Sequence, residues 1–252
     1  MPKKLSVITI NFNNHLGLVR TANSILTQSA RHSFEWIVID GASTDASKDW
    51  LNKNSSKIDI LISEPDQGIY DAMNKGIEAA SGEYIWFMNS GDAIFEPSTV
   101  EKLLNDLDSN MDVYFSDTMF IDQEGKELGL ISALKPQRFP QELRPDSFRF
   151  GMNICHQSFV ARKKVVPRYN LEYRLASDID WIIQILKKAP SNQCCKHVLS
   201  RFETGGSSYQ NTNEAWKERY KVLGHHYGKG MNIIAHAFIV LRRLFFKIGI
   251  RL

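Results

Sequence analysis

The sequence predicts an α/β protein with a mostly parallel sheet flanked by helices. Through the first half of the chain, short runs rich in β-branched and aromatic residues alternate with longer segments of helical periodicity. This alternation is typical of parallel strands joined by right-handed helical crossovers. The run from Tyr84 to Met88 is continuously apolar, as expected of a strand buried on both faces. A chain of 252 residues, 43% of them hydrophobic, can form one large core.

The first half alternates between predicted strands and predicted helices. Asn13 or Asn14 caps the first helix, and Ser43-Thr44-Asp45 can cap the second. The third helix ends at Ser81-Gly82, a C-terminal stop. The strands are residues 5–10, 35–39, 58–62 and 84–88, and the helices include residues 15–29, 69–80 and 98–107.

The second half of the chain is less regular. Asp122 to Gly125 predicts a hairpin turn between two short strands. Residues 135–150 contain three prolines and predict a loop, and Gly205 to Ser208 predicts a flexible one. The strands are residues 113–115, 119–121, 128–131, 155–161 and a short one at 198–199, and the helices are residues 178–188 and 213–225.

The charge distribution separates the C-terminal segment from the body. The whole chain carries +3, which gives no indication of a nucleic-acid partner. Residues 216–252 contain eight basic residues and one acidic residue, whereas the remainder is mildly acidic. The three cysteines, two of them adjacent, make a poor disulfide framework, and the first residues do not resemble a signal peptide. We expect a cytoplasmic protein.

Residues 233–252 have the pattern of an amphipathic helix. Ile234, Phe238, Leu241, Phe245 and Ile248 fall on one face, and His236, Arg243, Lys247 and Arg251 fall on the other. The longest uncharged run, residues 231–241, is too short to span a bilayer, which needs about 20 residues. The combination favours a helix lying on an anionic membrane surface. A helix packed on the body, or a dimer contact, is the alternative.

Polar residues gather where the predicted first, second and fourth strands end. These ends are Thr9-Ile10-Asn11, Asp40 to Asp45, and Asn89 to Asp92. In an open parallel sheet such ends share one crevice, where ligands bind. Asp40 can accept hydrogen bonds from a ribose or a base, whereas Asp45 reads as a turn or cap residue. Asp92 is placed to hold a divalent cation against a phosphate.

Two common phosphate sites are absent from the sequence. No G-x-G-x-x-G follows the first strand, and no G-x-x-x-x-G-K-[ST] occurs anywhere. A dinucleotide oxidoreductase and a P-loop enzyme are therefore disfavoured. The negative charge of a phosphate would instead be neutralised by a metal bound to Asp92, together with cations such as Lys75.

Four ordered motifs resemble those of glycosyltransferase family 2. They are Thr9-Ile10-Asn11, Asp40 to Asp45, Gly68 to Gly76, and Asn89-Ser90-Gly91-Asp92. The match is close over about residues 5–100 and continues more loosely to about residue 210. The resemblance implies a GT-A-like fold with a Rossmann-like sheet and a nucleotide-diphosphate sugar donor. It also implies a divalent metal, Mg²⁺ or Mn²⁺, and inversion at the anomeric carbon.

The resemblance also assigns donor-binding residues. Thr9, Asn11 and Asp40 would line the nucleoside pocket, with Asp66 near the nucleoside or ribose. Asn89, Ser90 and Asp92 would lie at the diphosphate. Asp92 matches the last carboxylate of a metal-binding motif, but Asn89 and Gly91 stand where the family often has further carboxylates. One carboxylate can still bind Mg²⁺ when the diphosphate supplies other oxygens.

The family places a general base at the start of a helix in the second half. Asp178 is the expected base, with Asp180 as its competitor. Without the resemblance, both would be ordinary first-turn acids. His156 and Gln157 resemble a segment near the acceptor, and Phe202 to Ser208 resembles a loop that closes over substrates.

The resemblance and the basic C-terminal segment together predict a two-part organisation. Residues 1–212 would form the GT-A domain, with a nucleotide-sugar-binding half (1–110) and an acceptor half (111–212). Residues 213–252 would form the basic, membrane-associating helical segment.

The expected function is that of a bacterial surface-polysaccharide glycosyltransferase, peripheral on the inner face of the cell membrane. Its acceptor would be a saccharide or a polyprenyl-diphosphate-linked sugar. A sugar-nucleotide pyrophosphorylase would require a Gly-rich loop with Arg or Lys after the first strand. This chain has Asn11 to Asn14 there, which argues against that alternative. A non-catalytic sugar-nucleotide-binding scaffold is the other alternative, because Asn89 and Gly91 could mark a lost metal site.

Overall fold

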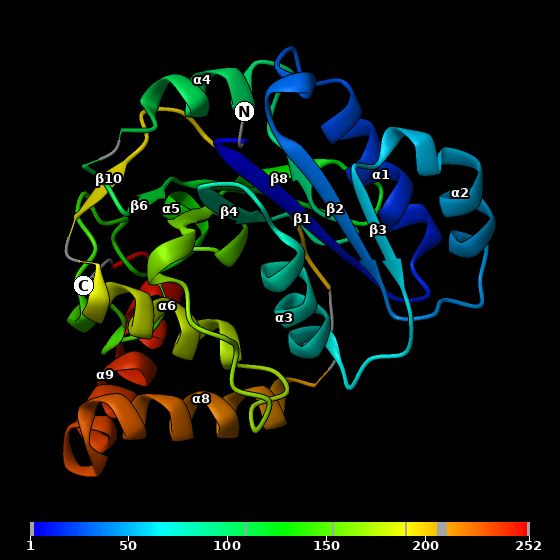
Figure 1. Ribbon diagram of the computed structural model, residues 1–252. Coiled ribbons are helices and arrows are strands. Elements are labelled where there is room, and N and C mark those ends of the chain that lie inside the picture. The colour runs from blue at the N-terminus through cyan, green and yellow to red at the C-terminus, as the bar shows by residue number, and fades with distance from the viewer. Residues whose placement is uncertain (1–2, 109, 153, 190, 206–210, 251–252) are drawn as a thin grey trace.

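A seven-stranded sheet in the order β10-β6-β9-β4-β1-β2-β3 forms the centre of the molecule (Figure 1). The computed structural model describes residues 3–108, 110–152, 154–189, 191–205 and 211–250. Strands β1, β2, β3 and β4 are parallel, whereas β9 runs antiparallel between β4 and β6. The strands of this sheet are β1 (Leu5–Asn11), β2 (Glu35–Asp40), β3 (Ile60–Ser63), β4 (Tyr84–Phe87), β6 (Val113–Phe115), β9 (Phe159–Arg162) and β10 (Asn192–Cys194).

Both faces of this sheet are buried, as the apolar strands predict. In β1, Ile8 packs in one core cluster and Val7 in the other, because alternate side chains point to opposite faces. Helices α3 (Ile69–Ala79) and α6 (Ser177–Lys188) cover the Ile8 face. Helices α1 (His15–Leu26), α2 (Ser47–Asn54) and α4 (Thr99–Asp106) cover the other. The expected α/β architecture is confirmed.

A second sheet, in the order β5-β11-β7-β8, lies beyond the ends of the first. Its strands are β5 (Ala93–Ile94), β7 (Thr118–Ile121), β8 (Glu127–Leu130) and β11 (Ser200–Glu203), and β8 leads into the short helix α5 (Ile131–Leu134). The pairing of β5 with β11 carries residues 200–203 alongside the turn that follows β4. This sheet therefore brings the second half of the chain to the end of strand β4.

Helices α8 (Thr212–Tyr227) and α9 (Lys229–Lys247) pack on each other beside α6 (Figure 1). Asn232 of α9 fixes the pair, since its amide donates to the carbonyl of Tyr220 at 2.9 Å. Among the described residues, no helix has both the length and the apolar character that a bilayer crossing requires.

Several predicted elements differ from the structure. Residues 155–161 are not one strand: a 3₁₀ turn over His156–Ser158 precedes β9. The strand expected at residues 198–199 starts instead at Ser200. Strands β5 and β10 and helix α5 were not predicted, because they are short and carry little hydrophobic periodicity. The loop expected at Gly205 to Ser208 lies, apart from Gly205, outside the described residues.

Candidate active site

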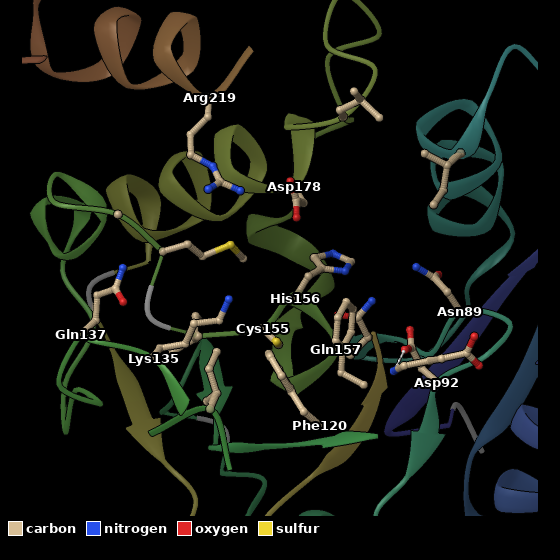
Figure 2. Close-up of a pocket in the computed structure, with 18 of the residues that line it drawn as sticks. Asn89, Asp92, Phe120, Lys135, Gln137, Cys155, His156, Gln157, Asp178 and Arg219 are labelled. Atoms are coloured by element: carbon tan, nitrogen blue, oxygen red, sulfur yellow. Dashed lines mark hydrogen bonds between the residues drawn. The ribbon is translucent and has the colours of Figure 1, made fainter. Parts of the chain in front are cut away.

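One cavity of about 550 Å³ opens beyond the end of β4. Its walls come from distant parts of the chain: the turn after β4, helices α3, α6, α8 and α9, the 3₁₀ turn at residue 156, and strand β11 (Figure 2). Of the predicted site residues, it is lined by Asn89, Ser90, Asp92, His156, Gln157 and Asp178. The structure therefore unites the two regions predicted to hold the metal and the base.

Asp92 is almost entirely buried at the floor of this cavity. One carboxylate oxygen accepts the backbone N–H of Glu203 at 3.0 Å. Desolvation raises the pKa of Asp92 to about 8, although the Glu203 N–H and the Gln157 side chain favour the ionised form. A bound cation would reverse this shift, because it stabilises the carboxylate directly.

The surroundings of Asp92 suit a divalent cation. The side-chain oxygen of Asn89 is buried and finds no hydrogen-bond donor among the described residues. Asn89 Oδ1 and the Asp92 carboxylate are the hard oxygen ligands that Mg²⁺ and Mn²⁺ prefer. The residues present thus fit the expected metal.

Glu203 is a second carboxylate at this corner; the sequence analysis included it only within the Phe202 to Ser208 loop and assigned it no role of its own. It lines the cavity and pairs with Arg20 of α1. A Cβ at Gly91 would lie 3.0 Å from Glu203 Oε2, and Gly91 has a φ of +108°. Because Gly91 has no side chain, it leaves room for the Glu203 carboxylate at the end of β11. Glu203 belongs to the segment Phe202 to Ser208 that resembles a closing loop, but nothing in that segment predicts a carboxylate beside Asp92, which lies more than a hundred residues earlier.

The ends of β1, β2 and β3 are joined by buried hydrogen bonds. Asp40 is fully buried and accepts hydrogen bonds from Asn11, Ser43 and Ser63 at 2.6–2.9 Å. Asn11 also accepts a hydrogen bond from Ser90 at 2.8 Å. The network links the predicted nucleoside residues to the turn that carries Asp92.

Two predicted donor residues have other partners. Thr9 is fully buried, and its hydroxyl accepts the indole N–H of Trp36 at 3.0 Å. Lys75 pairs with Glu64 at 2.8 Å, and this contact raises the pKa of Lys75. Neither lines the cavity. The structure thus does not bring the Thr9 and Lys75 side chains to the Asp92 corner.

Asp66 lies at the outer edge of the strand ends. Its carboxylate accepts the backbone N–H of Gly68 at 2.8 Å, and together with Phe12 it packs against Gly41. The ring of Phe12 is 63% exposed. An exposed aromatic ring beside a carboxylate is a surface on which a nucleoside can stack and form hydrogen bonds. The sequence analysis had not selected Phe12.

Asp178 and Asp180 have different environments. Asp178 faces the cavity, where Tyr70 donates a hydrogen bond to it at 3.3 Å. Desolvation raises its pKa, and the nearby Arg219 acts in the opposite direction. Asp180 does not line the cavity and bonds His226 of α8 at 2.6 Å. Of these two carboxylates, only Asp178 lines the cavity.

His156 belongs to an aromatic cluster under the cavity. Its ring lies 5.2 Å from Phe87 and 5.4 Å from Trp181, and its Nε2 bonds the hydroxyl of Tyr169 at 2.6 Å. Burial lowers the pKa of His156 to about 3, so the imidazole is neutral at physiological pH. Gln157 is held through its backbone carbonyl, which accepts the Trp86 indole N–H at 2.7 Å. Both side chains border the cavity on well-fixed backbone.

The C-terminal helix predicted within residues 233–252 has buried and exposed positions that the structure now defines. Arg242 is buried and donates to the carbonyl of Phe150 at 2.5 Å, and Arg243 lines the cavity. Ile234 and Leu241 are exposed, on a stripe that also includes Ile233, Val240, Leu244 and Ile248. Arg243 and Lys247 of the predicted polar face are exposed, and so are Ile234, Leu241 and Ile248 of the predicted apolar face. The buried arginine is Arg242, which the prediction had placed on neither face.

A second group of metal-ligand residue types lies outside the cavity. The ligand atoms of Asp106, Cys195 and His197 are all within 4.8 Å of one another. Burial raises the pKa of the Cys195 thiol to about 12, and Asp106 contributes in the same direction. In the metal-free protein the thiol is therefore protonated.

Known proteins similar to this chain are glycosyltransferases. The chain is 31% identical over 254 residues to an uncharacterized glycosyltransferase of Mycobacterium tuberculosis, covering 93% of this chain and 89% of that protein. It is 28% identical over 213 residues to a PGL/p-HBAD biosynthesis glycosyltransferase of Mycobacterium bovis, covering 81% and 78%.

Two solved structures show the same fold. Staphylococcus aureus TarS (residues 1–349) in complex with UDP-GlcNAc superposes with a TM-score of 0.70 at 16% identity, over 96% of this chain and 73% of that one. The mannosyltransferase PcManGT from Pyrobaculum calidifontis, in complex with GDP-Man and Mn²⁺, gives 0.62 at 15% identity, over 96% and 72%. The expected GT-A-like fold is confirmed.

The sequence profile of "Glycosyl transferase family 2" matches residues 6–169, a span that runs from β1 to the aromatic cluster under the cavity. Its match covers the strand ends, the Asp92 corner and His156. This chain therefore belongs to glycosyl transferase family 2 and is a glycosyltransferase.

Proposed function

We propose that this enzyme moves a sugar, with inversion, from a nucleotide-diphosphate donor to a hydroxyl of a saccharide or polyprenyl-diphosphate-linked acceptor. The setting would be bacterial surface-polysaccharide synthesis at the inner face of the cell membrane. One observation carries the proposal: a single cavity holds the oxygen-rich corner of Asn89 and Asp92 and, across from it, the carboxylate of Asp178 (Figure 2).

The donor would bind from the strand ends toward Asp92. Asp66 and Phe12 would contact the nucleoside, and Asn11 and Asp40 would fix the backbone beneath it. Thr9 and Lys75 would support this surface indirectly, Thr9 through Trp36 and Lys75 through Glu64. TarS and PcManGT were solved with nucleotide sugars, which supports a donor of this class.

The diphosphate would lie at Asn89, Ser90 and Asp92. The Mn²⁺ in the PcManGT structure supports a divalent metal here. When bound by Asp92 and Asn89, Mg²⁺ or Mn²⁺ would neutralise the charge of the leaving diphosphate. Glu203 adds a second carboxylate to that corner.

Asp178 would act as the general base. It takes the proton of the acceptor hydroxyl as that oxygen attacks the anomeric carbon. The bond from this carbon to the diphosphate oxygen breaks, and the nucleoside diphosphate leaves with the bonding pair. Attack opposite the leaving group inverts the configuration. The raised pKa of Asp178 favours proton uptake.

The acceptor would enter past His156 and Gln157. Because His156 is neutral, it would position sugar hydroxyls and would carry no charge.

We also propose that the chain is divided into a transferase domain, residues 1–212, and a C-terminal segment, residues 213–252, and that the two halves of the domain meet at residue 110. Trp216, Arg219 and Arg243 line the cavity, so the C-terminal segment would take part in acceptor binding as well as in membrane contact.

A panel of nucleotide sugars tests the proposed function. We expect slow hydrolysis of one donor, dependent on Mg²⁺ or Mn²⁺ and abolished by Asp92→Asn. NMR of the transfer product would show the anomeric configuration opposite to that of the donor. Nucleotide binding that ignores metal, with no donor consumed by the wild-type enzyme, would instead indicate a non-catalytic scaffold.

A further inference from the structure

Three cations from separate elements meet at the end of the cavity away from Asp92. Lys135 follows α5, Arg219 lies on α8 and Arg243 on α9, and all three line the cavity. In Figure 2, Lys135 and Arg219 approach from opposite walls and point toward one another, with Asp178 beside Arg219. We call Lys135, Arg219 and Arg243 the cationic cluster.

Aromatic rings hold these cations in place. The guanidinium groups of Arg219 and Arg243 lie 5.9 Å and 4.5 Å from the ring of Trp216. The ammonium of Lys135 lies 5.5 Å from the ring of Phe120. A ring face stabilises a cation without cancelling its charge. The cluster therefore keeps its positive potential.

The two arginines of the cluster have no acidic ion-pair partner within the part of the chain that the structure describes, although Asp178 lies near Arg219. The Nε of Arg219 is buried and has no hydrogen-bond partner there. Burial lowers the pKa of Lys135, and the nearby Arg219 and Arg243 act in the same direction through a poorly screened medium. This repulsion would be relieved by an anion.

We propose that the cationic cluster is a subsite for a phosphate or diphosphate carried by the acceptor. The forked guanidinium groups match phosphate oxygens, and the lysine adds a point charge. The donor diphosphate is assigned to the opposite end, at Asp92. The inference rests on the proposed function and refines it, since it favours the phosphate-bearing acceptor over a neutral saccharide.

The position of the cluster limits the acceptor further. Arg219 is near enough to Asp178 to lower the pKa of that carboxyl. Phosphate and reacting hydroxyl must therefore fit together in one cavity of about 550 Å³. The phosphate would be attached to the sugar that receives the transfer, or to the next one. Arg243 also adjoins the exposed aliphatic stripe of α9, which would face a lipid attached to the phosphate.

Calorimetry of the full chain in EDTA tests the subsite with two probes, inorganic diphosphate and farnesyl diphosphate. EDTA keeps a metal-dependent anion site at Asp92 from contributing. We expect Arg219→Gln and Arg243→Gln each to weaken binding by about tenfold, the loss of one charge-assisted contact. Arg243 lies at the exposed mouth of the cavity, so its variant carries little folding risk.

Lys221→Gln is the matched control, because Lys221 is exposed on the same helix as Arg219 and does not line the cavity. It and Asp92→Asn should bind both probes as the wild type does. Tighter binding of farnesyl diphosphate supports the subsite and indicates a lipid-linked acceptor; equal binding supports it and indicates a soluble glycosyl phosphate. Affinity unchanged in both arginine variants, or lost in Asp92→Asn, overturns the proposal.

Hydrolysis of the donor, measured in parallel, separates the two proposals. Hydrolysis without diphosphate binding in EDTA would overturn the subsite and leave the transferase chemistry standing. Cluster-dependent diphosphate binding without consumption of any nucleotide sugar would support the subsite and count against the proposed donor chemistry.

Discussion

Asp178 and Asp180 are two positions apart on α6, so their side chains point in different directions around the helix. Asp178 points into the cavity with Tyr70 and Arg219 close by, and Asp180 points toward α8. The sequence could not separate them, because both are acidic first-turn residues of an amphipathic helix. The packing of α8 against α6 is what gives the two carboxylates different surroundings.

Replacing Asp178 by Asn should reduce transfer by about 10²–10⁴-fold, the usual contribution of a general base. Donor affinity should stay near that of the wild type, because the donor corner lies across the cavity. Rates are compared at saturating acceptor, and donor affinity by calorimetry. A variant that retained near-normal turnover would show that Asp178 is not the base.

Asp92 is expected to make stability depend on pH. Its carboxyl has a pKa of about 8 in the folded protein and an ordinary pKa near 3.8 when unfolded. Between these values the unfolded chain has lost the proton that the folded protein keeps, so stability falls as pH rises and levels off above about pH 8. Asp92→Asn does not titrate and should become progressively more stable than the wild type between pH 4 and pH 8.

Urea unfolding at a series of pH values, with EDTA present, measures this difference. Metal binding should follow the opposite trend, because the cation requires the ionised carboxylate: wild-type affinity for Mn²⁺ should rise toward pH 8. A stability difference that stayed constant across this range would mean that Asp92 ionises normally in the folded protein.

At the scale of single residues, the sequence predicted the positions that sit in local motifs. Asn89 and Asp92 follow a buried strand, and the structure places both in the cavity. Lys135 and Arg219 were missed because nothing in their local sequence differs from ordinary surface charge, and Glu203 was included only as part of the predicted closing loop. Their role depends on contacts between elements far apart in the chain, and such contacts cannot be recognised from a single sequence.

Strand β11 shows the same limit at the scale of elements. Its sequence, Ser200 to Glu203, mixes polar and apolar residues and carries no strand pattern. It forms because β7 and β5 pair with its two edges. The central strands were predictable because a continuous apolar run by itself indicates a strand buried in a sheet. Strand β11 forms only because particular neighbouring strands pair with it. That pairing is what places Glu203 beside Asp92.

The contact between α6 and α8 should depend on Asp180. Its carboxylate bonds both His226 and, at 2.7 Å, Gln184. Asp180→Ala leaves a buried imidazole nitrogen without its partner, so we expect a loss of about 2–4 kcal/mol in unfolding free energy. The transfer rate of the folded variant should change little. Urea titration and kinetics well below the melting temperature measure the two effects.

Asp180→Asn serves as the conservative control, because the amide can still bond His226. It should recover part of the lost stability. If this variant instead kept full stability and lost transfer, with Asp178→Asn active, the roles of the two carboxylates would be reversed.

Over the whole molecule, α8 and α9 close one end of the cavity and present an apolar surface outward. Arg242 of α9 is buried against the body and Arg243 lines the cavity, and the exposed stripe contains Ile233, Ile234, Val240, Leu241, Leu244 and Ile248. An apolar stripe of this extent marks an interaction site. A lipid surface fits it, since the cavity mouth beside Arg243 would then open at the membrane where a lipid-linked acceptor resides.

We therefore expect the double change Ile233→Ser and Leu244→Ser to weaken binding to vesicles of phosphatidylglycerol and phosphatidylethanolamine by tenfold or more. Each substitution removes an exposed aliphatic side chain, worth about 1.5 kcal/mol when fully buried in lipid. Leu16→Ser is the control, because Leu16 is 80% exposed on α1, remote from the stripe. Co-sedimentation measures the binding, and light scattering measures the mass in solution. If all variants bound vesicles equally, the stripe would be assigned to a protein contact instead of the membrane. The same would follow if the wild type were a dimer and the double variant a monomer.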